Sequence, residues 1–260
     1  MEKLDAELDH HLRIAGRATS AYIEEKRQFW ESVLELVRRH NGGRIGRPVL
    51  EIGNGPFGAF LALDRRDTVC VDPLNGRYRE IFPHFKALES RFIESGIESA
   101  GTPGRFSTII SYNSLDHVDD AERAVAKMAE LSRKGAVLLV GVDYYRSGLL
   151  RSFMHAFRRH IDTPHPHHFL LGELEELLGR HFEILEITDN SRFRVVEEGL
   201  PERKTGFIDE FMARPAGALA GAAYRGAYLA GKKLGMGGRE ANLGIKKMAV
   251  FVLRKERATE

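Results

Sequence analysis

The chain has 260 residues, and its 39 lysine and arginine side chains almost balance 37 aspartate and glutamate side chains, for a formal net charge of +2. This balance gives no global drive toward nucleic acid or a membrane surface, so neither partner is expected. The single cysteine, Cys70, excludes a disulfide within the chain. The charged N-terminus lacks an apolar signal core, and the Ala- and Gly-rich stretch 213–235 is too weakly apolar to span a membrane. We therefore expect a cytoplasmic globular protein with one principal core.

Two helices are predicted before the first strand. Apolar residues recur at helical spacing, first at Leu4 and Leu8, then at Phe29, Val33 and Val37. The Asn41-Gly42-Gly43 run ends the second helix. Residues 1–44 are interpreted as a helical lid or cap.

The stretch from Val49 to Phe60, VLEIGNGPFGAF, predicts a strand, a ligand loop and the start of a helix. Gly53, Gly55 and Gly58 have the G-x-G-x-x-G spacing that permits a tight turn and a close approach of the main chain to a ligand. This spacing alone is weak evidence. Glu51 adds information, because a carboxylate beside the loop suits a cationic ligand better than the pyrophosphate that a bare helix N-terminus attracts.

A second acid supports a nucleoside site. The run TVCVDPL, from Thr68 to Leu74, predicts a buried strand ending at Asp72, nineteen residues beyond Gly53. An acid at this distance is suited to binding the two hydroxyls of a ribose, but it does not distinguish one nucleoside cofactor from another.

These two motifs resemble those of the class I S-adenosylmethionine-dependent methyltransferases, whose first motif is an acid, an apolar residue and G-x-G, followed by an acid at the end of the next strand. The resemblance implies S-adenosyl-L-methionine as cofactor. It further implies that Glu51 holds the cofactor's ammonium group, that Asp72 binds the ribose, and that Leu74 and Ile97 flank the adenine. The remaining cofactor-binding residues implied are Gly53, Asn54, Gly55, Gly58, Pro73, Glu98 and Asn113.

Strands and helices alternate through the rest of the core. Arg105–Asp120 resembles the family's fourth strand and following loop, Val137–Val142 its fifth strand, and Phe182–Thr188 its sixth. The alternation predicts an α/β fold, a Rossmann-like, doubly wound, mostly parallel seven-stranded sheet with helices on both faces. Residues 45–190 are assigned to this core, 191–246 to a helical insertion, and 247–260 to the last strand, at Met248–Leu253, and a tail.

The insertion is the expected specificity element, because it is far longer than an ordinary strand connection. Counted from Asn190 to Lys247, eleven basic side chains exceed six acidic ones by five. This excess is read either as a solvated helical surface or as a basic rim that steers an acidic or glycosylated substrate.

Histidines are the candidate catalytic residues. His117 follows the fourth strand, where it is suited to act as a general base, to contact substrate, or to have a structural role. His165 and His168 belong to a histidine-rich loop expected over the active site. No metal site is predicted, because HPHH lacks the i, i+4 helical arrangement that presents two imidazoles together.

The leading hypothesis is methyl transfer to an oxygen or nitrogen of a sugar, metabolite or natural product. One alternative is an NAD(P)-dependent oxidoreductase, which lacks support because Tyr144 and Tyr145 have no lysine at the usual following spacing. The other is a noncatalytic nucleoside-binding scaffold. The oligomeric state is left open.

Overall fold

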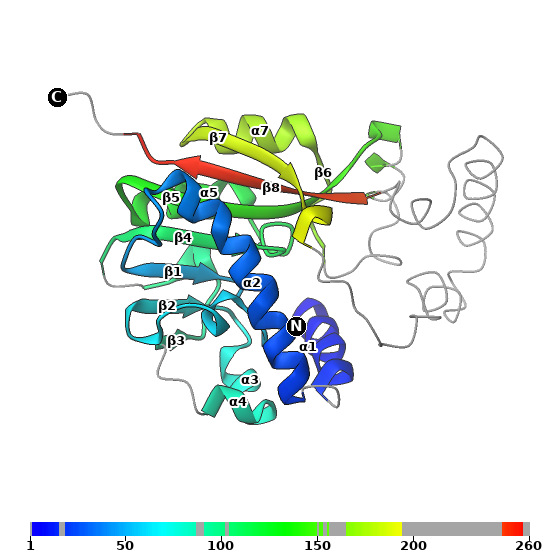
Figure 1. Cartoon of the computed structure of the whole chain (residues 1–260). Helices are drawn as coiled ribbons and strands as arrows, with labels where there is room; N and C mark the ends of the chain where they lie inside the picture. The colour runs from blue at the N-terminus through cyan, green and yellow to red at the C-terminus, as the bar shows by residue number, and fades with distance from the viewer. Residues whose placement is uncertain are drawn as a thin grey trace.

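A computed structural model describes residues 2–15, 19–86, 91–101, 104–149, 151–152, 155, 165–193 and 246–256. Most of the predicted insertion, 191–246, lies outside these ranges, so its helices and its basic rim stay predictions. Figure 1 shows a central sheet with helices on both faces. None of the described helices is long and apolar enough to cross a membrane.

The sheet confirms the predicted Rossmann-like topology. Its strand order is β3-β2-β1-β4-β5-β8-β7, with a short β6 paired to β5. The strands β1 to β5 are parallel, and β8 runs antiparallel to both β5 and β7. Because β1 pairs with β2 on one side and β4 on the other, the chain order reverses at β1. The strands are β1 Val49–Ile52, β2 Thr68–Val71, β3 Arg91–Ile93, β4 Phe106–Tyr112, β5 Ser132–Tyr145, β6 Phe169–Leu170, β7 Glu183–Asp189 and β8 Lys246–Arg254.

The helices include the two predicted before the sheet. They are α1 Glu2–Ala15, α2 Ser20–His40, α3 Asn75–Ile81, α4 Pro83–Lys86, α5 Ala121–Leu131 and α7 Leu171–Gly179, with 3-10 turns η1 Ala59–Leu61, η2 Arg65–Asp67, η3 Ile97–Ser99 and η4 Asn190–Phe193. The helix predicted to start after the glycine loop is wrong, because only the three-residue η1 forms there. The space beside η1 is filled by α2, whose Trp30 donates from Nε1 to the Phe57 carbonyl at 2.7 Å.

Helix α2 packs as one layer of the α/β core. It lies across one face of the sheet (Figure 1), with a fully buried stripe that includes Val33, Leu34 and Val37. This stripe packs on Val49, Leu139 and other sheet residues, and burial of each large apolar side chain contributes about 1.5–3 kcal/mol. On the opposite face of the sheet, α5 and α7 bury their own apolar residues in a second cluster.

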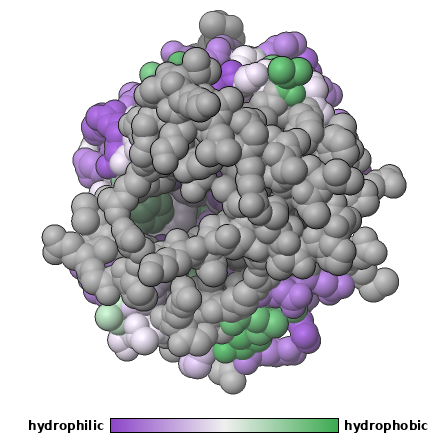
Figure 2. All heavy atoms as spheres, turned by 90° about the vertical axis from the view of Figure 1, so that its right-hand side faces the viewer, coloured by the Kyte–Doolittle hydropathy of each residue, from purple (hydrophilic) through white to green (hydrophobic). Residues whose placement is uncertain are grey.

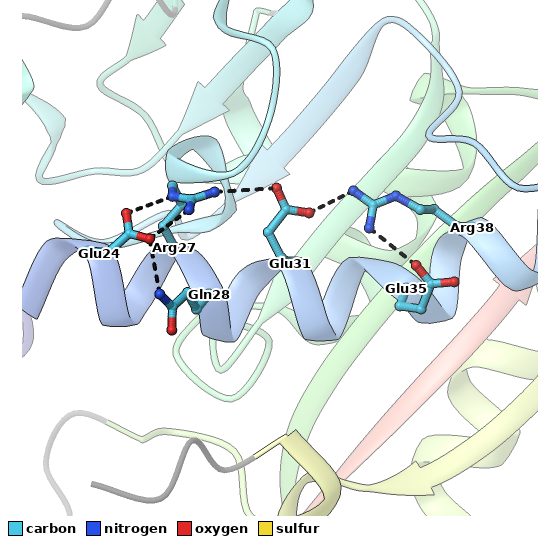
Figure 3. A network of polar contacts seen from close by, with 6 residues as sticks. All are labelled: Glu24, Arg27, Gln28, Glu31, Glu35 and Arg38. Carbon is cyan, nitrogen blue, oxygen red and sulfur yellow. Dashed lines mark hydrogen bonds and ion pairs between the residues drawn. The ribbon is translucent and has the colours of Figure 1, made fainter. Parts of the chain in front are cut away.

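The polar side of α2 carries a chain of ion pairs (Figure 3). Arg27 pairs with Glu24 at 2.6 Å, and Arg38 pairs with Glu31 at 2.8 Å and Glu35 at 3.3 Å. The side chains of these pairs are 28–59% exposed, so each pair contributes about 0–1 kcal/mol. The buried stripe, rather than the ion pairs, therefore fixes α2 on the sheet.

Candidate active site

A cavity of about 470 Å³ lies where β1, β2 and β4 end. In parallel α/β sheets, ligands bind at the carboxyl ends of the strands, where the strand order reverses, and the volume is that of a small-molecule site. Figure 2 views the molecule from the side toward which these strands run, and its coloured residues form both hydrophilic and hydrophobic patches. The lining comprises Leu4, Glu7, Ile52, Gly53, Val71, Asp72, Pro73, Ser95, Gly96, Ile97, Glu98, Ser99, Asn113, Ser114, His117, Val118, Asp119, Asp120 and Arg123.

At two positions in the loop after β1, only glycine fits, because a Cβ would clash with a neighbouring side chain. Gly53 has φ of 63°, and a Cβ there would lie 2.2 Å from the Cβ of Ser114 in the loop after β4. Gly58 lies above Glu51, and a Cβ there would lie 2.2 Å from Glu51 Oε1. The first glycine thus lets the two loops meet at the cavity, and the second leaves room for the buried carboxyl group.

Glu51 binds the main chain rather than facing the cavity. Its Oε1 accepts from the Ala59 N–H at 2.5 Å and its Oε2 from the Phe60 N–H at 2.8 Å, which are the first two N–H groups of η1. Burial raises the pKa of Glu51 to about 8, although these two hydrogen bonds act in the opposite direction. Glu51 is absent from the cavity lining, so its geometry does not support the expected ammonium contact.

Asp72 follows the last residue of β2 and faces the cavity. Its Oδ1 accepts from the Leu74 N–H at 2.8 Å and its Oδ2 from the Gly55 N–H at 3.0 Å. Burial raises its pKa to about 6, and the nearby Glu7 carboxylate adds to the rise. The glycine loop is therefore tied directly to the acid that the sequence singled out.

The cavity lining contains half of the residues predicted for the site. Those that line it are Gly53, Asp72, Pro73, Ile97, Glu98, Asn113 and His117, and those outside it are Glu51, Asn54, Gly55, Gly58, Leu74, His165 and His168. Asn54 holds the loop through bonds from Nδ2 to the Gly55 carbonyl and to Asn75 Oδ1. Leu74 packs in an apolar cluster beside Tyr78 and Phe82, which gives it a core position.

The lining also includes charged residues that sequence reasoning missed. Glu7 comes from α1, and Arg123 comes from the first turn of α5. Glu98 Oε1 accepts from the Asp119 and Asp120 N–H groups at 2.8 and 3.3 Å, which fixes the loop before α5. The described lining carries five carboxyl side chains, Glu7, Asp72, Glu98, Asp119 and Asp120, against the single guanidinium of Arg123.

Two of the predicted histidines meet beside a buried acid. The rings of His117 and His165 lie 4.3 Å apart between centroids, and His165 Nε2 lies 3.8 Å from Asp116 Oδ2. Glu7 Oε2 lies 3.8 Å from His117 Nδ1 on the other side. His168 is elsewhere, buried with its ring edge-to-face against Tyr145 at 5.4 Å.

A larger hollow of about 860 Å³ lies at the opposite end of the sheet. Its lining includes Val49 at the start of β1, Ser107 near the start of β4, and Gly135. Ligands in this class of fold bind at the carboxyl ends of the strands, so the smaller cavity is the candidate active site.

Comparisons with known proteins show the fold. No protein-family model and no curated protein matches the chain. The YcgJ protein from Bacillus subtilis is similar at 18% identity and TM-score 0.60, covering 87% of this chain and 99% of its own. The N-methyltransferase NodS from Bradyrhizobium japonicum WM9, in complex with S-adenosyl-L-homocysteine, is similar at 14% identity and TM-score 0.50, covering 87% of each chain. The [4+2]-cyclase SpnF is similar at 18% identity and TM-score 0.50, covering 85% of this chain and 79% of its own. The chain therefore has the Rossmann-like methyltransferase fold that the sequence predicts.

Proposed function

We propose that the chain is an S-adenosylmethionine-dependent methyltransferase that acts on an oxygen or nitrogen of a small-molecule acceptor. The observation that carries this proposal is the charge arrangement at the glycine loop. Both main-chain donors at the start of η1 already bind Glu51, so the pyrophosphate of a dinucleotide finds neither of them. The five carboxyl groups of the cavity lining oppose an anion further, whereas they favour a sulfonium with an ammonium group.

Asp72 is proposed to bind the cofactor's ribose. Each of its oxygens accepts one main-chain hydrogen bond, and a carboxylate has about four lone-pair sites, so capacity for two ribose hydroxyls remains. Gly53 offers its main chain to the methionine part, and Ile97, which lines the cavity, offers an apolar surface to the adenine. Pro73, Glu98 and Asn113 complete the proposed contacts.

The chain's residues then have to align the reactants and exclude water. When bound, the cofactor supplies an activated methyl group, which an acceptor lone pair takes by in-line displacement. Leu4 and Glu7 of α1 line the cavity, so α1 is proposed to act as a lid that shields it from water. Proton removal from the acceptor is assigned to the cluster of Asp116, His117 and His165.

Calorimetric titration of the purified protein with S-adenosylhomocysteine, S-adenosylmethionine and NAD tests the proposal. We expect micromolar affinity, about −8 kcal/mol, for the two adenosyl ligands and no heat from NAD. Asp72→Asn should weaken S-adenosylhomocysteine binding by about 10-fold or more, because a hydrogen bond to a charged group contributes about 1.5–3 kcal/mol. Asp67→Asn is the matched control, since Asp67 is an exposed acid paired with Arg47 at the opposite end of β2.

Binding of NAD alone, or equal affinity in Asp72→Asn and the unaltered protein, would contradict these assignments. Methyl transfer itself is tested separately, by formation of S-adenosylhomocysteine from S-adenosylmethionine in the presence of a panel of hydroxylated and amine acceptors. Release of product that depends on one acceptor is expected. If the protein binds the cofactor but forms no S-adenosylhomocysteine with any acceptor class, the proposed methyltransferase activity is contradicted.

A further inference from the structure

The cluster at the end of β4 has the composition of a metal centre. Asp116, His117 and His165 each offer one ligand atom, and these atoms all lie within 4.8 Å of one another. Around a tetrahedral ion with bonds of about 2.1 Å, ligand atoms stand about 3.4 Å apart. Small rotations of the three side chains would therefore bring them onto a single ion.

The main chain holds the cluster together across a long sequence separation. Asp116 and His117 are adjacent in the loop after β4, where the His117 N–H donates to the Ser114 carbonyl at 3.1 Å. His165 lies in the loop before β6, and the His167 N–H donates to the Asp116 carbonyl at 3.5 Å. The two loops are thus joined at the point where the three side chains meet.

The surroundings favour a cation. Asp116 is 1% exposed, and the side chains of His117 and His165 are 17% and 21% exposed. A carboxylate in such a place is costly unless a cation or hydrogen bonds compensate it. Glu7 Oε2, at 3.8 Å from His117 Nδ1, adds negative charge and is placed to orient that imidazole as a supporting carboxylate does in metal sites.

We propose that Asp116, His117 and His165 bind a divalent first-row metal ion such as zinc. Two imidazoles and one carboxylate suit zinc and its neighbours better than magnesium or calcium, which prefer oxygen ligands throughout. Three protein ligands leave a coordination position open, and His117 lines the cavity together with Asn113 and Ser114. One of the three proposed ligands, His117, thus borders the candidate active-site cavity.

The role of the ion rests on the proposed function, although its binding does not. An ion held by these three residues would lower the pKa of an acceptor hydroxyl bound to it, so the hydroxyl proton would pass to solvent more readily. The acceptor oxygen then forms a bond to the methyl carbon, and the carbon–sulfur bond breaks with its electron pair retained by sulfur. The cluster to which proton removal is assigned thus acts through the ion, and its two histidines serve as ligands and not as general bases.

Metal binding is tested on the full chain without an affinity tag, after treatment with a chelator. Titration with zinc chloride should give one ion per chain with a micromolar or lower dissociation constant, and cobalt(II) should give visible absorption bands typical of tetrahedral nitrogen and oxygen ligands. His165→Ala and Asp116→Asn should each weaken binding by about 10-fold or more. His181→Ala is the matched control, because His181 lies beyond the end of α7 and outside the cluster.

Each variant must be folded before its zinc affinity is compared with that of the unaltered protein. Urea unfolding establishes this for every variant, and Asp116→Asn is chosen because it preserves the size of the side chain. Zinc binding that is absent, or that His165→Ala and His181→Ala weaken equally, would overturn the site. S-adenosylhomocysteine binding without zinc binding would overturn the metal site and leave the methyltransferase proposal intact. Zinc binding without S-adenosylhomocysteine binding would support the metal site and contradict the methyltransferase proposal.

Discussion

Substitution of Gly58 by alanine tests the packing of the glycine loop on Glu51. The backbone of Gly58 has φ of −75°, which alanine adopts readily, so any effect must come from its new Cβ. That atom would lie 2.2 Å from Glu51 Oε1 and 2.5 Å from the Asn54 carbonyl oxygen. Since the Asn54 oxygen belongs to the main chain, the Glu51 side chain is the group that must move first.

The expected cost follows from the bonds that Glu51 would lose. If its carboxyl group rotates away, the N–H groups of Ala59 and Phe60 stay buried without an acceptor. Each such group costs about 1–3 kcal/mol, so Gly58→Ala should lower the free energy of unfolding by about 2–6 kcal/mol. Urea unfolding followed by circular dichroism measures this value, and the slope with denaturant verifies that the transition is unchanged in kind.

Gly172→Ala is the matched control, because a Cβ at Gly172 in α7 would meet nothing within 4 Å. It should leave stability unchanged or raise it by up to about 1 kcal/mol through helix propensity. In a Glu51→Ala background, Gly58→Ala should cost less, since only the contact with Asn54 remains. A loss below about 1 kcal/mol for Gly58→Ala in the unaltered background would refute the proposed packing of the loop on Glu51.

Three further predictions concern charge and packing. The affinity for S-adenosylhomocysteine should rise as pH increases through 6, because the pKa of Asp72 is raised to about 6 and only its ionised form accepts two ribose hydroxyls. Calorimetry from pH 5 to 8 checks this rise, and Asp72→Asn should remove the pH dependence. The free energy of unfolding should fall from pH 5 to 8 more in the unaltered protein than in Glu51→Gln. The folded pKa of Glu51, about 8, exceeds its unfolded value near 4.5, so the native state retains a proton that the unfolded chain has released. Equal pH profiles of the two proteins in urea titrations would contradict this. Trp30→Ala should cost about 3–5 kcal/mol in urea unfolding, because Trp30 is 6% exposed and hydrogen-bonded to the Phe57 carbonyl. Glu31→Ala, at the neighbouring position whose side chain is 39% exposed, should cost less than about 1 kcal/mol, and similar losses for the two variants would be inconsistent with a helix held by its buried face.

Most of the sheet was predictable because its strands are buried on both faces. Buried, mostly apolar runs identify strands of a parallel sheet without any alignment, as in Val137–Val142 and in Val49–Ile52, where Glu51 is the one polar residue. The three-residue β3, with the sequence RFI, is too short to give such a run. The helix expected after the glycine loop failed for a tertiary reason, because α2 covers that face of the sheet and contacts the loop through Trp30.

The histidine cluster shows what local patterns miss. The sequence places His165 in a tract whose spacing argues against a metal site, and it places His117 in a different motif. The spacing of the tract and the motif around His117 each describe only residues that are close together in the sequence. The structure joins Asp116 and His117 to His165 across almost fifty positions, through main-chain contact between two loops. Contacts of this range, like that of Glu7 with His117, follow from the arrangement of the strands and α1, so spacing alone could not reveal them.

The two acids of the cofactor motifs look equivalent in the sequence, but depth along the sheet separates them. In the parallel register Glu51 lies beside Cys70, two residues before Asp72. Two residues of a strand span about 6.6 Å, so Glu51 lies beneath the loop while Asp72 lies beyond the last residue of β2. Glu51 therefore binds the N–H groups of η1 beneath the loop, whereas Asp72 lies at the cavity, where a ligand could contact it. The two proposed roles, exclusion of a pyrophosphate by Glu51 and binding of a ribose by Asp72, rest on this difference in depth.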